Sequence, residues 1–265
     1  MGRTTKKKQT PRSRARANNV RRRRRNWLLV RTLLAVGLVA GLGYAFYSYM
    51  VESPRFNVKR VRVEGARMLR EEHVLAVAGI TRAHNLLGFR PEQVATRVAR
   101  MPYVRDCEVR RAYPDMVVIR IEEREPAATV LIDQRAFEID LSGVVLRELA
   151  PLAEPTGPMI TGVPELVFAE VGDELEYPEL SAALGVWRAF RETPLAEELT
   201  LSEIGAFSTN YLATYFNELP YEVRWGRGDP CGQAHRFHVL WEKRGGALPC
   251  SEYLDLRFNN DLPCK

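Results

Sequence analysis

The stretch TLLAVGLVAGLGYAFYSYMV, residues 32–51, carries no formal charge over twenty residues and is rich in Leu, Val, Ala and Gly. A helix of this length measures about 30 Å, which is the thickness of the hydrocarbon core of a bilayer. Trp27 precedes the stretch and three tyrosines lie near its other end, and aromatic side chains favour the two membrane interfaces. The sequence therefore predicts one transmembrane helix over residues 27–51.

The segment before this helix is strongly basic. Residues 1–25 carry twelve Lys or Arg and no Asp or Glu, whereas the rest of the chain holds 27 basic and 33 acidic residues. Such a segment has too little apolar surface to offset the entropy lost on ordering, so we expect residues 1–26 to form a disordered tail. Positive charge beside a span stays on the cytoplasmic side. We therefore expect a cytoplasmic tail, with the chain beyond Glu52 outside the cytoplasm.

Two other interpretations of this region are weaker. A cleaved signal peptide would have a shorter apolar region, and the helix ends in Tyr-Ser-Tyr-Met-Val without a small-x-small cleavage site. The arginines would bind any polyanion, but no aromatic residue precedes Trp27, so the tail lacks a base-stacking platform. At the inner membrane surface it would meet anionic lipid first. We expect an uncleaved anchor and no nucleic-acid partner.

Beyond Pro54 the hydrophobic pattern predicts a compact α+β module. Alternating positions predict strands and 3.6-residue periodicity predicts helices, with Gly79 as a helix stop and Tyr113-Pro114-Asp115 as a turn. The expected order is β-α-α-β-β, with two helices on one face of a three-stranded sheet. The expected elements are Asn57–Glu64, Arg70–Ala78, Pro91–Arg100, Val104–Ala112 and Met116–Glu122.

The remaining chain predicts a mixed β-sheet domain with flanking helices. Short apolar runs separated by turn residues predict the strands, and two amphipathic stretches predict the helices. The expected strands are Thr129–Asp133, Phe137–Asp140, Val144–Arg147, Met159–Gly162, Thr200–Phe207, Tyr211–Phe216, Glu222–Trp225 and Glu252–Phe258, and the expected helices are Pro178–Arg191 and Gly232–Lys243.

Several short motifs occur in a fixed order along these elements. They are V-x-V-E-G at Val61–Gly65, N-L-L at Asn85–Leu87, M-P-Y-V at Met101–Val104, V-R-R-A-Y-P at Val109–Pro114, I-E-E-R-E-P-A at Ile121–Ala127, G-V-V at Gly143–Val145 and Y-L-D-L-R-F at Tyr253–Phe258. In this order they resemble a POTRA domain followed by the β-domain of the FtsQ/DivIB family of bacterial division proteins. The resemblance covers residues 20–262 and implies a POTRA domain at 55–125 and a β-domain at 126–265.

The resemblance implies a function in binding. A member of this family is expected in the cell inner membrane at the division septum, as a divisome scaffold whose β-domain binds the bitopic proteins FtsB and FtsL near its last strand. The POTRA domain would take part in recruitment, and no cofactor is implied. The alternative is a POTRA-bearing chaperone or translocation component that handles envelope clients. Such proteins carry several modules or a β-barrel, and this chain has one module and no run of barrel strands.

A search for chemistry in the sequence gives no catalytic constellation. The sequence contains no G-x-S-x-G nucleophile elbow, no H-E-x-x-H motif and, outside the predicted membrane helix, no Gly-rich phosphate loop. Glu122, Glu123 and Glu125 lie at a strand end, where alternation points them to different faces. We therefore expect no enzyme, and neither catalytic, cofactor-binding nor metal-binding residues.

The candidate partner-binding residues lie in and after the last strand. A strand edge offers unpaired N–H and C=O groups to a partner strand. Alternation puts Tyr253, Asp255 and Arg257 on an accessible face and Leu254, Leu256 and Phe258 on the other, and we expect charge reversal at Arg257 to weaken binding with little effect on stability. An edge that is merely solvated is the alternative. The candidates are Tyr253, Asp255, Arg257, Phe258, Asn259 and Asn260.

The cysteines fit a chain that lies outside the cytoplasm, where disulfides persist. Cys231, Cys250 and Cys264 cluster near the C-terminus and predict one bridge among them, whose pairing stays open. They are not part of the usual family pattern. Zinc bound by Cys231, His235, His238 and Cys250 is a weaker interpretation, because C-x3-H-x2-H is not a usual ligand spacing. Cys107 fits a small buried residue in a strand.

Overall fold

A computed structural model describes residues 11–81, 84–258 and 262–265. The chain divides into two compact units. The first contains the described residues up to Arg60 together with Thr81–Phe89 and Arg111–Val117. The second contains Val61–Ile80, Arg90–Arg110 and Val118–Lys265.

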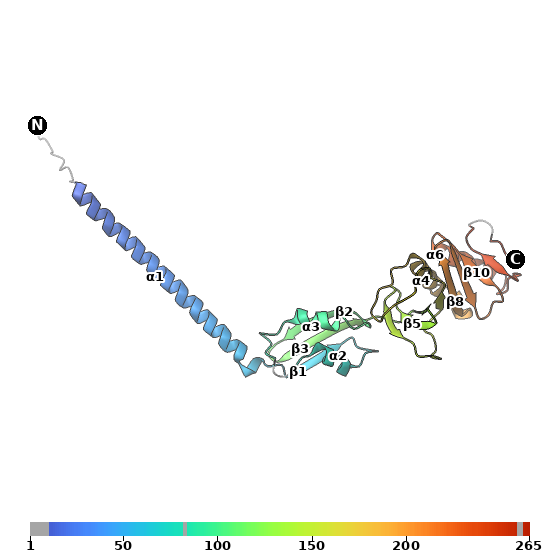
Figure 1. The fold of residues 1–265 in the computed structure, drawn as a ribbon, viewed down its shortest axis with the longest axis horizontal. Coiled ribbons are helices and arrows are strands. Elements are labelled where there is room, and N and C mark those ends of the chain that lie inside the picture. The colour runs from blue at the N-terminus through green and yellow to red at the C-terminus, as the bar shows by residue number, and fades with distance from the viewer. Residues whose placement is uncertain (1–10, 82–83, 259–261) are drawn as a thin grey trace, which may run out of the picture. The chain divides into compact units, whose positions relative to one another are not determined.

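The first unit begins with the long helix α1, Pro11–Glu52 (Figure 1). Within it, Leu29–Val51 is long and apolar enough to cross a membrane, has a mean hydropathy of 1.8 in its most apolar window, and is not buried by protein. An apolar helix that no protein covers fits a lipid environment. The chain therefore has one candidate membrane span in its described part, as the sequence predicts.

The basic tail differs from the expectation of disorder. Residues 11–25 belong to α1, while residues 1–10 lie outside the described residues. Arg and Ala are strong helix formers, and extending an existing helix avoids the cost of nucleation. The membrane helix therefore supplies the nucleus from which these basic residues continue as helix.

A short hydrogen-bonded segment follows α1. The 3-10 helix η1, Pro54–Phe56, leads into the next strand. Asn85 donates from Nδ2 to the carbonyl of Ser53 at 3.1 Å, Leu86 N–H donates to the Phe56 carbonyl at 2.8 Å, and Asn57 forms a β-bridge with Asn85. The N-L-L motif therefore binds the segment that leaves the membrane helix.

A three-stranded sheet with the order β1-β3-β2 follows, as the β-α-α-β-β pattern predicts. Its buried positions alternate in β3, where Val117, Ile119 and Ile121 are core residues. Gly79 ends α2 in the left-handed conformation, with φ of 62° and its N–H bonded to the Leu75 carbonyl. The elements are β1 (Arg60–Glu64), α2 (Glu71–Ala78), α3 (Pro91–Val98), β2 (Val104–Ala112) and β3 (Met116–Glu123).

The rest of the second unit is built on an eight-stranded mixed sheet with the order β11-β10-β9-β8-β7-β4-β5-β6. The pairs β10–β11, β4–β7 and β7–β8 are parallel, and the others are antiparallel. The strands are β4 (Ala128–Ile132), β5 (Arg135–Ile139), β6 (Val145–Glu148), β7 (Met159–Thr161), β8 (Leu201–Ser208), β9 (Tyr211–Phe216), β10 (Glu222–Trp225) and β11 (Tyr253–Asp255).

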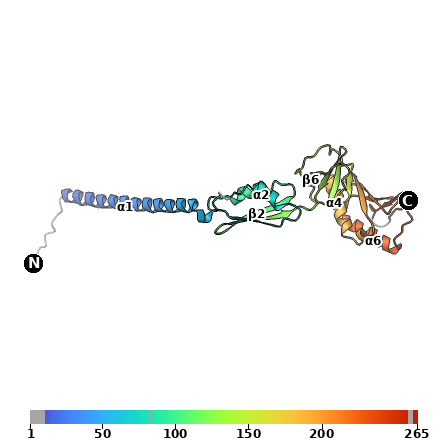
Figure 2. The ribbon, with the colours of Figure 1, turned by 90° about the horizontal axis from the view of Figure 1, so that it is seen from below.

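Helices α4 (Pro178–Arg191) and α6 (Pro230–Lys243) contact one another, and α4 also contacts β8. Figure 2 places both helices beside this sheet. Their apolar sides join the sheet in one core, in which Phe216 packs between Phe190 of α4 and Phe237 of α6 at centroid distances of 5.1 and 6.0 Å. The short helix α5, Leu195–Glu198, was not expected from the sequence. This helix-backed core fixes the position of the edge strand β11.

Candidate partner-binding edge

Strand β11 is the last strand at one end of the eight-stranded sheet. It pairs in parallel with β10, so that Leu254 lies opposite Val223 and Asp255 opposite Arg224. Leu254 and Leu256 are fully buried, in agreement with the predicted inward face. The helix-backed core therefore holds β11 from one side, and its other backbone edge points away from β10.

Asp255 does not lie on an accessible face, contrary to the expectation. It is 3% exposed and accepts hydrogen bonds from Arg257 through Nη2 at 2.6 Å, Nε at 2.9 Å and the backbone N–H at 3.0 Å. Burial alone would raise the pKa of Asp255, but the bonds from Arg257 outweigh it and lower that pKa. Alternation along a strand predicts on which face of the sheet a side chain lies, but not how deeply it is buried. Asp255 is buried because the Arg257 side chain folds over its carboxylate.

Gly226 makes this arrangement possible. A Cβ at this position would lie 2.7 Å from Cγ of Arg257 and 3.0 Å from the carbonyl oxygen of Asn210. Both separations are shorter than van der Waals contact, so a larger residue would displace the arginine. The glycine that follows β10 therefore leaves the space through which Arg257 reaches Asp255.

Tyr253 and Arg257 belong to a group of stacked side chains, here called the Arg–Tyr cluster: Tyr211, Arg224, Tyr253 and Arg257. The guanidinium carbon of Arg224 lies 3.8 Å from the ring centroid of Tyr253 and 5.8 Å from that of Tyr211. Arg257 lies 5.6 Å from the Tyr211 centroid. Cations above aromatic faces are attracted by the ring quadrupole. The cluster therefore forms a cationic and aromatic surface on β9, β10, the start of β11 and the residues that follow β11.

Glu222 ties this cluster to its neighbours. It accepts a hydrogen bond from Arg224 at 2.6 Å, from the Tyr211 hydroxyl at 3.3 Å and from the Tyr215 hydroxyl at 3.1 Å. Burial, followed by the bond to Glu222, raises the pKa of Tyr215 to about 12, and burial and Glu222 raise the pKa of Tyr211. Both hydroxyls therefore stay protonated donors at neutral pH.

Phe258 also differs from the sequence interpretation, which placed it with the inward set. Its side chain is 52% exposed, because β11 ends at Asp255 and the alternation of the strand does not reach position 258. Phe258 is thus an exposed apolar side chain beside the edge, which keeps it among the candidates for partner contact. Asn259 and Asn260 lie outside the described residues.

The outer edge of β11 is covered by residues Pro263–Lys265, here called the terminal segment. Asp255 N–H donates to the Pro263 carbonyl at 2.8 Å, and Tyr253 and Lys265 exchange two backbone hydrogen bonds of 3.1 Å. Leu254 and Cys264 form an antiparallel bridge. The expectation of an open edge is therefore wrong for this structure, because three residues of the chain itself pair there.

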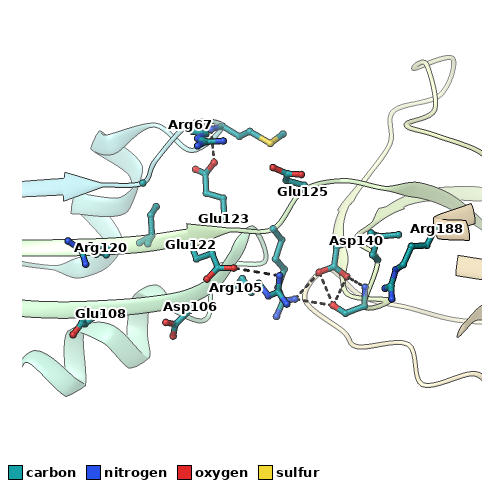
Figure 3. A pocket seen from close by; sticks show the side chains of 16 residues that line it. Arg67, Arg105, Asp106, Glu108, Arg120, Glu122, Glu123, Glu125, Asp140 and Arg188 are labelled. Carbon is teal, nitrogen blue, oxygen red and sulfur yellow. Dashed lines mark hydrogen bonds and ion pairs between the residues drawn. The ribbon is translucent and has the colours of Figure 1, made fainter. Parts of the chain in front are cut away.

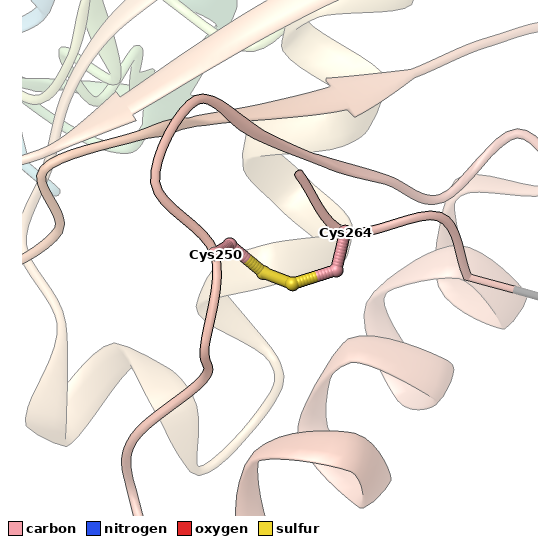
Figure 4. Close-up of a disulfide and its surroundings, with 2 residues drawn as sticks. All are labelled: Cys250 and Cys264. Atoms are coloured by element: carbon pink, nitrogen blue, oxygen red, sulfur yellow. A yellow bond between two sulfur atoms is a disulfide. The ribbon is translucent and has the colours of Figure 1, made fainter.

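A disulfide holds the terminal segment in place (Figure 4). Cys250 and Cys264 are bonded, with their Cα atoms 5.1 Å apart, and Cys231 is an exposed free thiol. Since Cys250 is bonded to sulfur, it cannot serve as a thiolate ligand, which removes the four-ligand zinc site considered above. Cys107 is half-buried, and burial, with the charge of Asp106 second, raises its pKa to about 11. It is therefore an unreactive thiol at neutral pH.

A charged pocket of about 840 Å³ lies elsewhere in the second unit, lined by β2, β3 and residues that follow β1, β3 and β5, together with Arg188 of α4 (Figure 3). Several of its charged side chains are held by ion pairs or backbone hydrogen bonds. Arg105 lies 3.5 Å from Glu122, Arg124 donates to Asp140 at 2.8 Å, and Glu123 accepts backbone N–H bonds from Met68 and Leu69.

These contacts decide the protonation of the pocket carboxylates. Burial alone would raise the pKa values of Glu123 and Asp140, but backbone N–H donors at both groups, with Ser142 and Arg124 at Asp140, lower them. Both groups are therefore ionised hydrogen-bond acceptors at neutral pH and hold neighbouring chain segments. They do not supply the proton donor that general acid catalysis requires.

Comparison with known proteins shows which family this chain resembles. Residues 56–124 match the family model of the POTRA domain, FtsQ-type. The chain is 28% identical to cell division protein FtsQ of Syntrophotalea carbinolica over 223 residues, which cover 84% of this chain and 78% of the relative. It is 23% identical to cell division protein FtsQ of Geotalea daltonii over 233 residues, 87% of this chain and 83% of that one. It is 30% identical to that of Caulobacter vibrioides over 129 residues, 49% and 41% of the two chains.

Proposed function

Because the chain belongs to the FtsQ/DivIB family of bacterial cell-division proteins, we propose that it is a bitopic scaffold of the divisome. In this role it links division proteins by binding them through its folded domains and catalyses no reaction. Glu123 and Asp140 of the pocket are engaged by Met68 and Arg124 of the chain itself, which favours a structural role for these carboxylates over one in general acid catalysis.

The proposed topology follows from charge. The twelve cations of residues 1–25 keep the N-terminal segment in the cytoplasm, where they contact anionic lipid at the inner surface of the membrane. The POTRA domain (55–125) and the β-domain (126–265) then lie on the other side of the inner membrane. The disulfide between Cys250 and Cys264 supports this location, because disulfides persist outside the reducing cytoplasm. The site of action is the division septum.

The proposed partners are FtsB-like and FtsL-like bitopic proteins, which bind at β11. The observation that carries this proposal is the pairing of the terminal segment with β11: a strand whose outer edge accepts one extended segment has the geometry to accept another. Phe258, exposed beside that edge, and the Arg–Tyr cluster supply side-chain contacts of the aromatic and arginine types that dominate interface energies.

Depletion of the protein in its own cells tests the scaffold role. We expect filamentous cells with segregated chromosomes, because growth continues while the septum does not assemble. Cells that divide normally and show defective outer-membrane assembly would instead support a POTRA-bearing chaperone or translocation component and refute this proposal.

A matched pair of phenylalanine variants tests the location of the partner site. Phe258→Ala in the full chain, reconstituted in lipid nanodiscs, should weaken binding of the FtsB-like protein from the same cell by about tenfold, the scale of about 1–2 kcal/mol at an interface residue. Phe168→Ala is the control, since that side chain is 61% exposed against 52% for Phe258. Equal binding by both variants would remove Phe258 from the contact.

A further inference from the structure

The terminal segment and β11 together form a closed edge. Tyr253 contributes its N–H and its C=O to the segment and Asp255 contributes its N–H, so these outward groups of β11 are already bonded. A partner strand that added to the same edge would need the same groups. The terminal segment is therefore a competitor, within the chain, for a strand that adds at β11.

Apart from the disulfide, the terminal segment is held by backbone hydrogen bonds, in which the Lys265 carbonyl also accepts the N–H groups of Ser251 and Glu252, and by the preceding Leu262, which packs against the core. Cys264 and Lys265 are exposed, so the segment buries little apolar surface, and its backbone bonds replace bonds to water with little net gain. The ion pair between Lys265 and Glu252, at 2.9 Å, joins two exposed side chains and adds little. A short segment that pairs with the edge of one strand is only marginally stable without a further constraint.

The disulfide supplies the missing constraint. Cys250 is 7% exposed and belongs to the core, whereas Cys264 lies at the centre of the terminal segment, opposite Leu254. The bond closes a loop with a sequence separation of 14 residues, which keeps the segment at a high effective concentration beside β11.

We propose that the terminal segment is a redox-controlled latch: the Cys250–Cys264 disulfide holds it on the β11 edge, and reduction of that disulfide opens the edge to a partner strand. This regulation rests on the function proposed above, because it acts on the same edge. The reductant is a dithiol of the cell envelope. One of its thiolates attacks the exposed Cys264 sulfur and displaces Cys250 as a thiolate, which takes up a proton.

The second thiol of the reductant then attacks the mixed disulfide and releases Cys264. The dithiol becomes a disulfide, and Cys250 and Cys264 become thiols, with two electrons and two protons transferred. The exposed position of Cys264 allows the first attack, since access to the attacked sulfur helps to set the rate of exchange. The released segment keeps its sequence and returns to the edge on reoxidation.

Amide hydrogen exchange of the full chain in lipid nanodiscs tests the latch without any partner. In the oxidised chain the amides of Tyr253 and Asp255 should exchange slowly. In Cys264→Ser, or after reduction of the wild type, they should exchange about tenfold faster or more, since the loop constraint is lost. The amide of Leu256 is an internal control, because it donates to Arg224 on the inner side at 2.9 Å. Cys231→Ser, a change at the exposed free thiol, should exchange like the wild type.

Binding of the FtsB-like protein from the same cell to these chains then tests the regulation. We expect Cys264→Ser and the reduced wild type to bind about tenfold more tightly than the oxidised wild type and Cys231→Ser. Unchanged protection of Tyr253 and Asp255 in Cys264→Ser would overturn the latch, and so would faster exchange with equally tight binding by all chains. Faster exchange in Cys264→Ser with no binding by any chain would overturn the proposed partner site. It would still support the claim that the disulfide holds the terminal segment over the β11 edge.

Discussion

Replacement of Arg257 by Glu is the sharpest test of how the β11 edge is built. Arg257 bonds Asp255 through two guanidinium nitrogens at 2.6 and 2.9 Å. The Asp255 side chain is 4% exposed and that of Arg257 is 35% exposed. The substitution leaves a buried carboxylate without its partner and places a second carboxylate beside it. It should therefore destabilise the fold, which contradicts the sequence-based expectation of a variant that loses binding alone.

The magnitude follows from the exposure of the pair. Removing one partner of a fully buried ion pair costs about 3–5 kcal/mol. Because about a third of Arg257 is in contact with water, screening lowers this cost, and we expect a loss of about 2 kcal/mol in the free energy of unfolding. With a urea m value of about 2 kcal/mol/M, the unfolding midpoint falls by about 1 M.

Urea unfolding of the full chain in detergent, followed by tryptophan fluorescence, measures this shift. Arg227→Glu is the matched control, because it makes the same change of charge at an exposed arginine close to β10. That control should unfold at the wild-type midpoint. If Arg257→Glu also unfolds within about 0.2 M of the wild type, the ion pair does not stabilise the edge and the reasoning fails.

Two further variants test the same region. The pKa of Asp255 lies below its ordinary value of 3.8, so its ionised form stabilises the fold above that value. The difference in unfolding free energy between wild type and Arg257→Gln should be complete above about pH 5 and should vanish as the pH falls through the folded-state pKa; a difference independent of pH between about 6 and about 2 would refute this. Trp225→Phe removes the indole N–H that bonds Thr214 at 2.8 Å in a fully buried position, and should cost about 2 kcal/mol in urea unfolding. Wild-type stability of that variant would show that the bond contributes nothing.

The regular elements could be predicted where the sequence carries a clear period and a clear stop. Helix α4 was expected over the residues that it occupies, because Pro178 at its start and an apolar stripe define it. Strands β9 and β10 were also expected with their observed bounds. Helix α5 has four residues, which is too short for a period to appear.

The last strand shows where alternation stops being informative. The pattern Tyr253–Phe258 predicted a strand from 252 to 258, but the strand has only three residues. The Asp255 carboxylate accepts the Arg257 N–H at 3.0 Å, which is a local turn of the kind that Asp favours. The side chain that alternation assigned to the outer face therefore ends the strand, and no period-2 pattern contains that information.

The cover of the β11 edge was not predictable because it depends on long-range geometry. The terminal segment has three residues and includes Pro263, which donates no backbone hydrogen bond, so it has no strand pattern. Three cysteines allow three pairings, and only the structure selects Cys250 with Cys264. The sequence could therefore indicate that a bridge exists near the C-terminus, but not that this bridge places a segment on the edge.

The cover on the β11 edge affects both unwanted pairing of the strand and the recognition of a partner. An uncovered edge strand exposes backbone donors and acceptors that pair with any extended chain, and a protein that lies at a crowded membrane surface would pair with wrong partners. Cover by residues 263–265 satisfies the outward groups of Tyr253 and Asp255 while no partner is bound. The partner proposed above would then have to offer more than backbone bonds, because those only replace bonds that the terminal segment already makes. In that proposal the surplus comes from side chains that contact Phe258 and the Arg–Tyr cluster, so a closed edge would make recognition depend on the sequence of the partner as well as on its strand geometry.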